Sequence, residues 1–227
     1  MTSGFDGVWQ VDRESSRGRY FNGAFPPDTV TFAGAIALKV ATGVDQRDAL
    51  VEGFTEIGAE MSSFFPEPNM RPDEVAHLVD LVIRDHNAQV TTASREAIAL
   101  LEAFDAMTIA GIVYSFAEGG DTQDVLEDIG ISARTLVDHG VAVRGYCFAH
   151  AGDADELIMN GQLALGYGIF AEAGSTPEEI GKEVAALLRE QGLPVRPHLS
   201  AEQRIIVGPM IYEIPFTGMD LEDIPEP

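Results

Sequence analysis

The chain has 227 residues, and 45% of them are hydrophobic, which is enough to build a substantial buried core. Its 37 acidic and 14 basic residues give a formal net charge of -23. A surface of this sign repels phosphate backbones and anionic lipid, so we expect no nucleic-acid partner and no membrane association. It suits a basic protein partner, or it keeps the protein in solution.

Cysteine usage and hydropathy indicate a soluble protein of the cytoplasm. The single cysteine, Cys147, cannot form an internal disulfide, so a secreted disulfide scaffold is excluded. The N-terminus lacks the features of a signal peptide. The chain also has no uncharged apolar run of about 18 residues, the length needed to span a bilayer.

The sequence pattern of residues 1–90 predicts a mainly helical N-terminal extension. The apolar residues between Thr29 and Val40 fit both a strand and a helix that ends at Gly43, and their spacing does not decide between the two. Asp45 is a good N-cap for a helix through about Met61. Pro72 occupies the first position of another helix with a clear apolar stripe.

The sequence pattern predicts an α+β domain over residues 91–216 and a disordered acidic tail over residues 217–227. A helix follows Ser94, and Thr176, Pro177 and Glu179 mark the start of another. From Gly111 the expected succession is strand 111–116, helix from 122 to about 138, strand 141–149, a helical insert, strand 163–169, helix 176–192 and strand 204–211. This β-α-β-β-α-β order is typical of a ferredoxin-like split βαβ sheet.

The strand that begins at Val141 has two different faces. Small apolar residues alternate with larger amphipathic ones, and we place the small set against helices 122–138 and 176–192. Tyr114 and Phe116 of the preceding strand, together with Tyr167, are expected to join the other face. The small set is Val141, Val143, Gly145, Cys147 and Ala149, and the large set is Ala142, Arg144, Tyr146, Phe148 and His150.

An aromatic sheet face is also typical of RNA-binding sheets that stack bases. Residues 91–227, however, carry 23 acidic and 7 basic groups, whereas single-strand binders surround their aromatic side chains with positive charge. We therefore expect this face to be covered by the N-terminal helices or by a second subunit. A ligand pocket at the seam is the alternative.

The candidate binding residues gather around this strand. His150 and Asp153, with Asp155 and Glu156, supply the groups of a metal site or of an acid–base pair. Their spacing matches no metal motif, so no metal or cofactor is expected, and His150 can simply end a strand while Asp153 caps a helix. The full candidate set is Arg144, Tyr146, Phe148, His150, Asp153 and Tyr167.

Two further features are not expected to form functional sites. The loop from Glu118 to Asp124 places two glycines before a helix, where backbone N–H groups can bind an anion, but its own carboxylates oppose a phosphate. Cys147 lies in mid-strand on the face expected to be buried, where thiols are usually inert.

Five segments of the chain resemble an uncharacterised bacterial family of unknown function. They are AGIVYSF and GDTQDVLEDIG, followed by GYCFAH, GQLALGYG and EIGKEVAALLREQGL. The resemblance covers about residues 94–209. Some relatives have a cysteine cluster after the first strand, where this chain has Ser115, Phe116 and Ala117. The resemblance therefore implies that metal binding through those thiols is not available to this chain.

Two functional hypotheses remain open. The first is a non-catalytic binding or regulatory module that acts through a protein partner or by self-association, for example as a homodimer. The second is a small-molecule or metal-dependent enzyme that uses His150 and nearby carboxylates. The fold alone does not choose between them.

Overall fold

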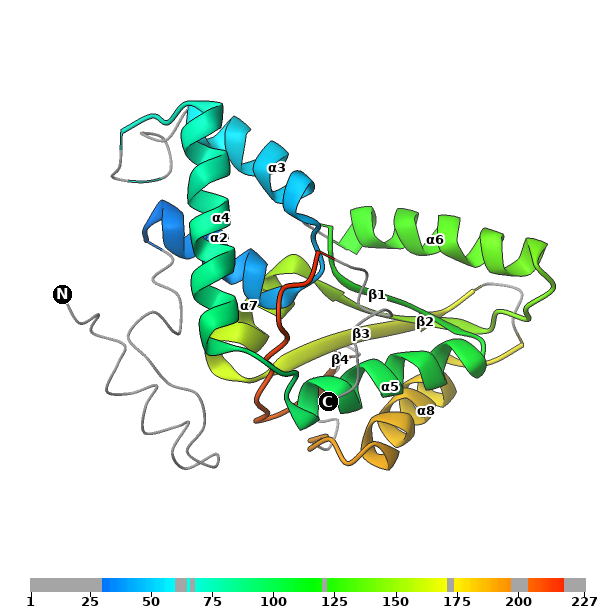
Figure 1. The fold of residues 1–227 in the computed structure, drawn as a ribbon. Coiled ribbons are helices and arrows are strands. Elements are labelled where there is room, and N and C mark those ends of the chain that lie inside the picture. Colours follow the sequence, from blue (N-terminus) through cyan, green and yellow to red (C-terminus); the bar gives the residue numbers. More distant parts are fainter. Residues whose placement is uncertain are drawn as a thin grey trace. The chain divides into compact units, whose positions relative to one another are not determined.

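The structure is a computed structural model that describes residues 30–59, 65, 68–119, 122–170, 174–196 and 204–218. It is a mixed α+β protein with two compact units (Figure 1). Unit 1 comprises the described residues of Met1–Ser94 and Glu213–Pro227, and unit 2 is formed within Arg95–Tyr212. The predicted acidic tail lies outside the described residues, apart from Thr217 and Gly218.

Unit 1 is helical in its described part before Ser94. Its helices are α2 (Phe32–Thr42), α3 (Arg47–Ala59) and α4 (Pro72–Gln89). The segment that fitted both a strand and a helix is therefore a helix, and its ends explain why. Thr31 Oγ1 accepts the Gly34 N–H at 3.0 Å, and Gly43 adopts φ 70°, the left-handed conformation that terminates helices.

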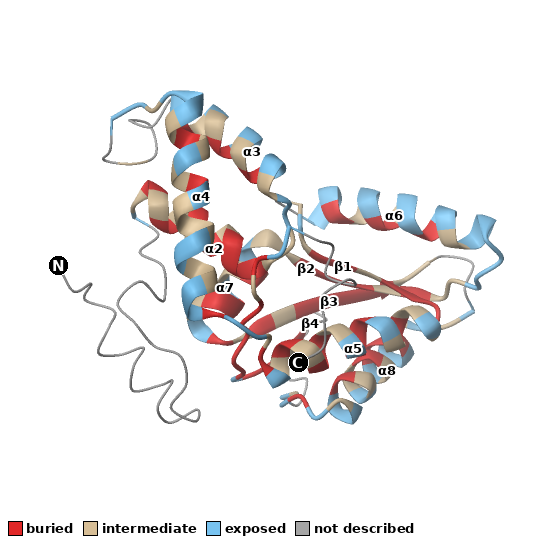
Figure 2. Ribbon diagram, viewed as in Figure 1, coloured by how far each residue is buried: buried red, intermediate tan, exposed pale blue. Residues whose placement is uncertain are grey.

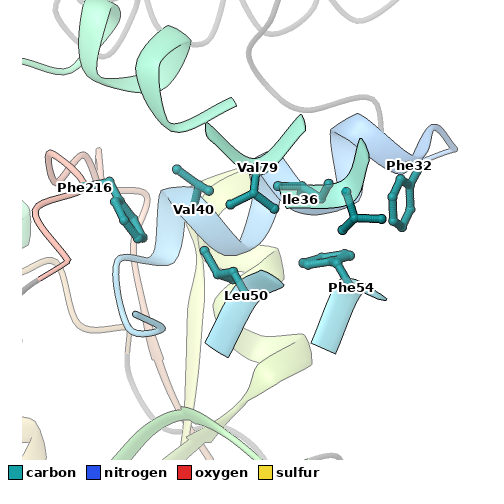
Figure 3. Packing of buried hydrophobic residues seen from close by; sticks show 8 residues of the cluster. Phe32, Ile36, Val40, Leu50, Phe54, Val79 and Phe216 are labelled. Carbon is teal, nitrogen blue, oxygen red and sulfur yellow. The ribbon is translucent and has the colours of Figure 1, made fainter. Parts of the chain in front are cut away.

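The core of unit 1 includes one side chain from the far end of the sequence. Figure 3 shows Phe216 next to the apolar residues of α2, α3 and α4. The Asn87 side chain holds this segment, because its Nδ2 donates to Phe216 O and its Oδ1 accepts from Phe216 N, both at 2.8 Å. The buried cluster is Phe32, Ile36, Val40, Leu50, Phe54, Val75, Val79 and Phe216.

Unit 2 contains a four-stranded sheet in the order β1-β2-β3-β4. Strands β1 and β2 are parallel neighbours, while the β2–β3 and β3–β4 pairs are antiparallel. The elements are α5 (Arg95–Ile109), β1 (Ile112–Glu118), α6 (Thr122–Asp138), β2 (Gly145–His150), α7 (Ala151–Asn160), β3 (Leu163–Ile169), α8 (Pro177–Glu190) and β4 (Arg204–Val207).

The predicted succession of strands and helices is present, but the ferredoxin-like strand arrangement is not found. In a split βαβ unit another strand separates the two parallel strands, whereas β1 and β2 here pair directly. Side-chain fit explains the pairing of β2 with β3. A Cβ added at Gly166 would lie 2.4 Å from Phe148 Cζ, so the aromatic ring of β2 occupies the space that the β3 glycine leaves open.

The helices of unit 2 cover opposite faces of the sheet, so placing helices 122–138 and 176–192 together was wrong for the first of them. Helix α8 lies against the small residues, since a Cβ at Gly145 would lie 2.8 Å from Ile180. Helix α6 packs on the large residues, with Val125 and Ile129 against Phe148. Figure 1 shows α6 on one side of the sheet and α5 and α8 on the other.

The face with the large residues is therefore covered in part by α6. Phe148 is only 8% exposed, while Tyr146 and His150 are partly buried. Figure 2 shows buried strands beneath α6 and an exposed outer side of that helix. The reason is the apolar stripe of α6, which needs a large apolar surface to pack against.

Candidate active site

The carboxyl ends of β1 and β2 meet at one edge of the sheet, because the two strands are parallel and adjacent. Helix α6 starts at Thr122, after β1, and helix α7 starts at Ala151, directly after β2. Both helix N-termini, the positive ends of the helix dipoles, lie at this edge. Ligands of open α/β sheets usually bind at this edge, beyond the strand carboxyl ends.

Three side chains at this edge form a chain of hydrogen bonds. His150 Nε2 lies 3.1 Å from Thr122 Oγ1, and His150 Nδ1 lies 2.9 Å from Asp153 Oδ2. An ionised carboxylate only accepts hydrogen bonds, so Nδ1 carries the imidazole proton. Nε2 of the neutral ring then has a free lone pair, and the Thr122 hydroxyl donates to it.

Asp153 is held by contacts from two other elements. Its Oδ2 accepts the His150 backbone N–H at 3.1 Å, and it also accepts from Arg204 Nη2 at the start of β4. Arg204 is fixed in turn by a bond to the Ala164 carbonyl at 3.1 Å. The His150 and Asp153 side chains are 19% and 13% exposed, so solvent screens their contact only in part.

Phe148 fixes the remaining side of the imidazole. The two ring centroids are 5.0 Å apart and the rings are nearly perpendicular, at 78°. Phe148 is itself held between α6 and Gly166. The packing of the sheet therefore sets the orientation of His150.

The end of β1 is irregular where it meets His150. The register with β2 shifts between Phe116 and Glu118, so that Glu118 pairs with His150, and Ala117 has φ 63°. A left-handed residue other than glycine costs about 1–2 kcal/mol. Bulges of this kind are common beside active sites, where they redirect a side chain. Glu118 Oε2 accepts the Ser115 hydroxyl at 3.0 Å.

The structure brings together four of the six residues that the sequence singled out. Tyr146, Phe148, His150 and Asp153 lie along one face, and the Tyr146 and Phe148 ring centroids are 6.2 Å apart. Burial raises the pKa of Tyr146, so its hydroxyl stays protonated at neutral pH.

The other two predicted residues lie elsewhere. Arg144 Nη2 donates to Glu183 of α8 at 2.6 Å and to the Ala110 carbonyl at 2.7 Å. Tyr167 lies on the opposite face of the sheet, where its ring packs against Gly181. Both residues therefore lie apart from the His150 group. Their assignment to a binding site stays a prediction.

Among the described residues, no three His, Cys, Asp or Glu side chains converge in a way that could hold a metal ion. Asp153 is engaged with His150 and Arg204, and Glu156 accepts from Asn160 on its own helix.

Comparison with known families gives one match. The sequence profile of a family described as Domain of unknown function (DUF6891) matches residues 27–213. The chain belongs to this family. The DUF6891 match confirms the resemblance to an uncharacterised family, and it extends well beyond the expected residues 94–209 to include α2, α3 and α4. No curated protein and no solved structure matches the chain.

Two residues at this edge of the sheet were missed from the sequence. The sequence pattern predicts Thr122 only as the start of a helix and Arg204 only as the start of a strand. Their positions in the chain could have indicated this for Thr122. In a βαβ unit whose two strands are adjacent, the first residue of the helix lies beside the carboxyl end of the second strand. The ferredoxin-like assumption separated those strands and hid this proximity.

None of the helices that the structure describes in this DUF6891 protein combines the length and apolar character needed to cross a bilayer.

Proposed function

We propose that the protein is an enzyme that hydrolyses or transfers a small acyl group, with Thr122 as nucleophile, His150 as general base and Asp153 as the group that orients the imidazole. The observation that carries this proposal is the continuous path from the Thr122 hydroxyl through both nitrogens of His150 to a carboxylate, with 3.1 Å and 2.9 Å separations. A nucleophile within reach of a base that a third group orients is the arrangement of activated hydroxyl enzymes.

The proposed reaction runs in two halves. Thr122 Oγ1 attacks the acyl carbonyl while its proton passes to His150 Nε2, and the imidazolium then protonates the leaving group, which departs from the tetrahedral intermediate. Water next attacks the acyl-threonine, gives its proton to His150, and releases the acid with the Thr122 hydroxyl restored. Asp153 stabilises the imidazolium that forms in each half.

Local charge supports this use of the site. The N-terminus of α6 provides positive potential at Thr122, where a developing oxyanion is stabilised. Arg204 donates to the Asp153 carboxylate, the same group that accepts from His150 Nδ1, and so helps to hold it in place. Charges of both signs lie at this edge, because Arg204 contacts Asp153 and Glu118 lies opposite His150 in the backbone register, so a neutral acyl compound suits the site.

Hydrolysis of p-nitrophenyl acetate and butyrate tests the proposal. Thr122→Ala and His150→Gln should each lower kcat/KM by about a hundredfold or more, while Thr122→Ser keeps activity. Thr135→Ala is the matched control, because Thr135 lies on the same helix and its hydroxyl only caps the Ile131 carbonyl. If the chain hydrolyses neither ester, or if the first two variants only lower the melting temperature, the hydrogen-bond chain is structural and the proposal fails.

A second candidate is a non-catalytic binding module that acts through a protein partner or by self-association in the cytoplasm. The supporting observation is that Ile131 and Val137 of α6 are 57% and 55% exposed on an otherwise strongly charged chain. Light scattering of the wild type and of Ile131→Lys tests this candidate. A concentration-dependent dimer that the substitution disrupts supports it, and a strict monomer contradicts self-association.

A further inference from the structure

A pocket of about 390 Å³ opens on the face of the unit 2 sheet opposite His150. Tyr167 of β3 and Ile205 of β4 form its floor, and these residues share the face that α8 covers. Its volume lies within the range of small-molecule sites. The lining residues are Tyr167, Glu178, Gly181, Lys182, Ala185, Arg189, Val195, Arg196 and Ile205.

The charge around this pocket is opposite to that of the protein. The chain has a net charge of -23 and only 14 basic residues. Three of these basic residues, Lys182, Arg189 and Arg196, line the pocket. Within the described part of the chain none of the three forms an ion pair, whereas Arg144 and Arg204 of the same unit pair with carboxylates. Glu178 is the one acidic residue among those that line the pocket, so the three cations leave an excess of positive charge there, which favours a negative ligand.

The remainder of the lining is apolar or aromatic. A Cβ at Gly181 would lie 2.5 Å from the Tyr167 ring, so the missing side chain lets this ring pack directly against α8 at the floor of the pocket. Burial and the nearby Glu178 raise the pKa of Tyr167, which therefore contributes no negative charge at neutral pH. Val195, Ala185 and Ile205 supply further apolar surface.

We propose that this pocket binds a small organic anion that carries two negative charges at one end of a flat apolar body. The two guanidinium groups and the ammonium bind the charged end, because planar arginines match phosphate and carboxylate oxygens. The body lies on Tyr167 and Ile205. Both phosphate monoesters and dicarboxylates have this chemistry, and the pocket is separate from the His150 site.

Isothermal titration of the full chain with phenyl phosphate and with phthalate tests the proposal and separates the two sources of charge. We expect at least one of them to bind, and to bind about tenfold or more tightly than phenol or inorganic phosphate. The double substitution of Arg189→Gln and Arg196→Gln should weaken this binding by about tenfold or more, as should Ala185→Phe, which fills the pocket without changing charge.

Two controls keep the outcome decisive. Arg134→Gln removes one exposed cation on α6, and Thr122→Ala alters the proposed active site, so neither should change the affinity. No binding of either probe overturns the proposal, and equal weakening by Arg134→Gln overturns it by showing nonspecific attraction. Because Thr122→Ala is tested in the same series, loss of the acyl-transfer activity and loss of the pocket are distinguished.

Discussion

Substitution of Gly166 by alanine should destabilise unit 2, although alanine in a strand usually gives a more stable protein than glycine does. The strand conformation of Gly166 tolerates a side chain, and replacing glycine there removes an entropic penalty of about 0.5–1 kcal/mol. The new Cβ, however, would lie 2.4 Å from Phe148 Cζ and 2.6 Å from its Cε1. Phe148 is 8% exposed and packed against α6, so its ring cannot move away freely.

Overpacking costs about 1–3 kcal/mol, and so close an approach to a confined ring belongs to the upper part of that range, about 2–3 kcal/mol; after the entropic gain we expect a net loss of about 1–2.5 kcal/mol. In a domain of this size, that loss lowers the melting temperature by roughly 3–10 °C. Thermal unfolding followed by circular dichroism measures it. Gly130→Ala is the matched control, because nothing lies within 4 Å of the added Cβ and a helical glycine gains about 1 kcal/mol as alanine.

A double substitution identifies the cause of the effect. Shortening the side chain with Phe148→Leu makes room for the methyl group, so Gly166→Ala should cost much less in that background. If Gly166→Ala is neutral or stabilising in the wild type, or if its cost is unchanged beside Phe148→Leu, the close fit between β2 and β3 does not determine the stability of the sheet.

Three further outcomes are expected. Phe216→Ala should destabilise unit 1 by about 3–5 kcal/mol in urea unfolding, because its buried ring completes the core, and a loss below about 1 kcal/mol contradicts this packing. Burial lowers the pKa of His86 below 6.5, so its contribution to the free energy of unfolding is complete above pH 6.5 and is lost as the pH falls through the lowered pKa. His86→Gln keeps a donor for the Ile214 carbonyl but does not titrate, so the free energy of unfolding measured in urea should vary less with pH in this variant. Burial raises the pKa of Cys147 to about 12, so a thiol reagent at about pH 8 should label it only after unfolding, and rapid labelling of the native protein contradicts its position in β2.

Local signals in the sequence predicted most of the elements. Helix α8 begins as expected, with Thr176 Oγ1 accepting from the Glu179 N–H at 3.2 Å and Pro177 in the first position. Strand β3 and the helical insert between β2 and β3 also have the predicted character. Capping and hydrophobic spacing act within a few residues, so they can be read from a single chain.

The pairing of strands and the site that depends on it could not be predicted in the same way. Gly166 and Gly168 look like flexible positions in the sequence, yet they make room for Phe148 and Tyr146 of the neighbouring strand. This complementarity between segments far apart in the sequence decides which strands are adjacent. Thr122 and His150 are 28 residues apart, and only the parallel pairing of β1 and β2 brings them into contact.

The most direct test of the proposed chemistry is covalent trapping of the nucleophile. The protein is treated with a fluorophosphonate, an acyl-transfer inhibitor that reacts with activated hydroxyl groups, and the modified peptide is located by mass spectrometry. We predict one adduct on Thr122, which is lost in His150→Gln and retained in Thr135→Ala. No adduct, or an adduct on Thr122 that forms equally well without the imidazole, would contradict the account.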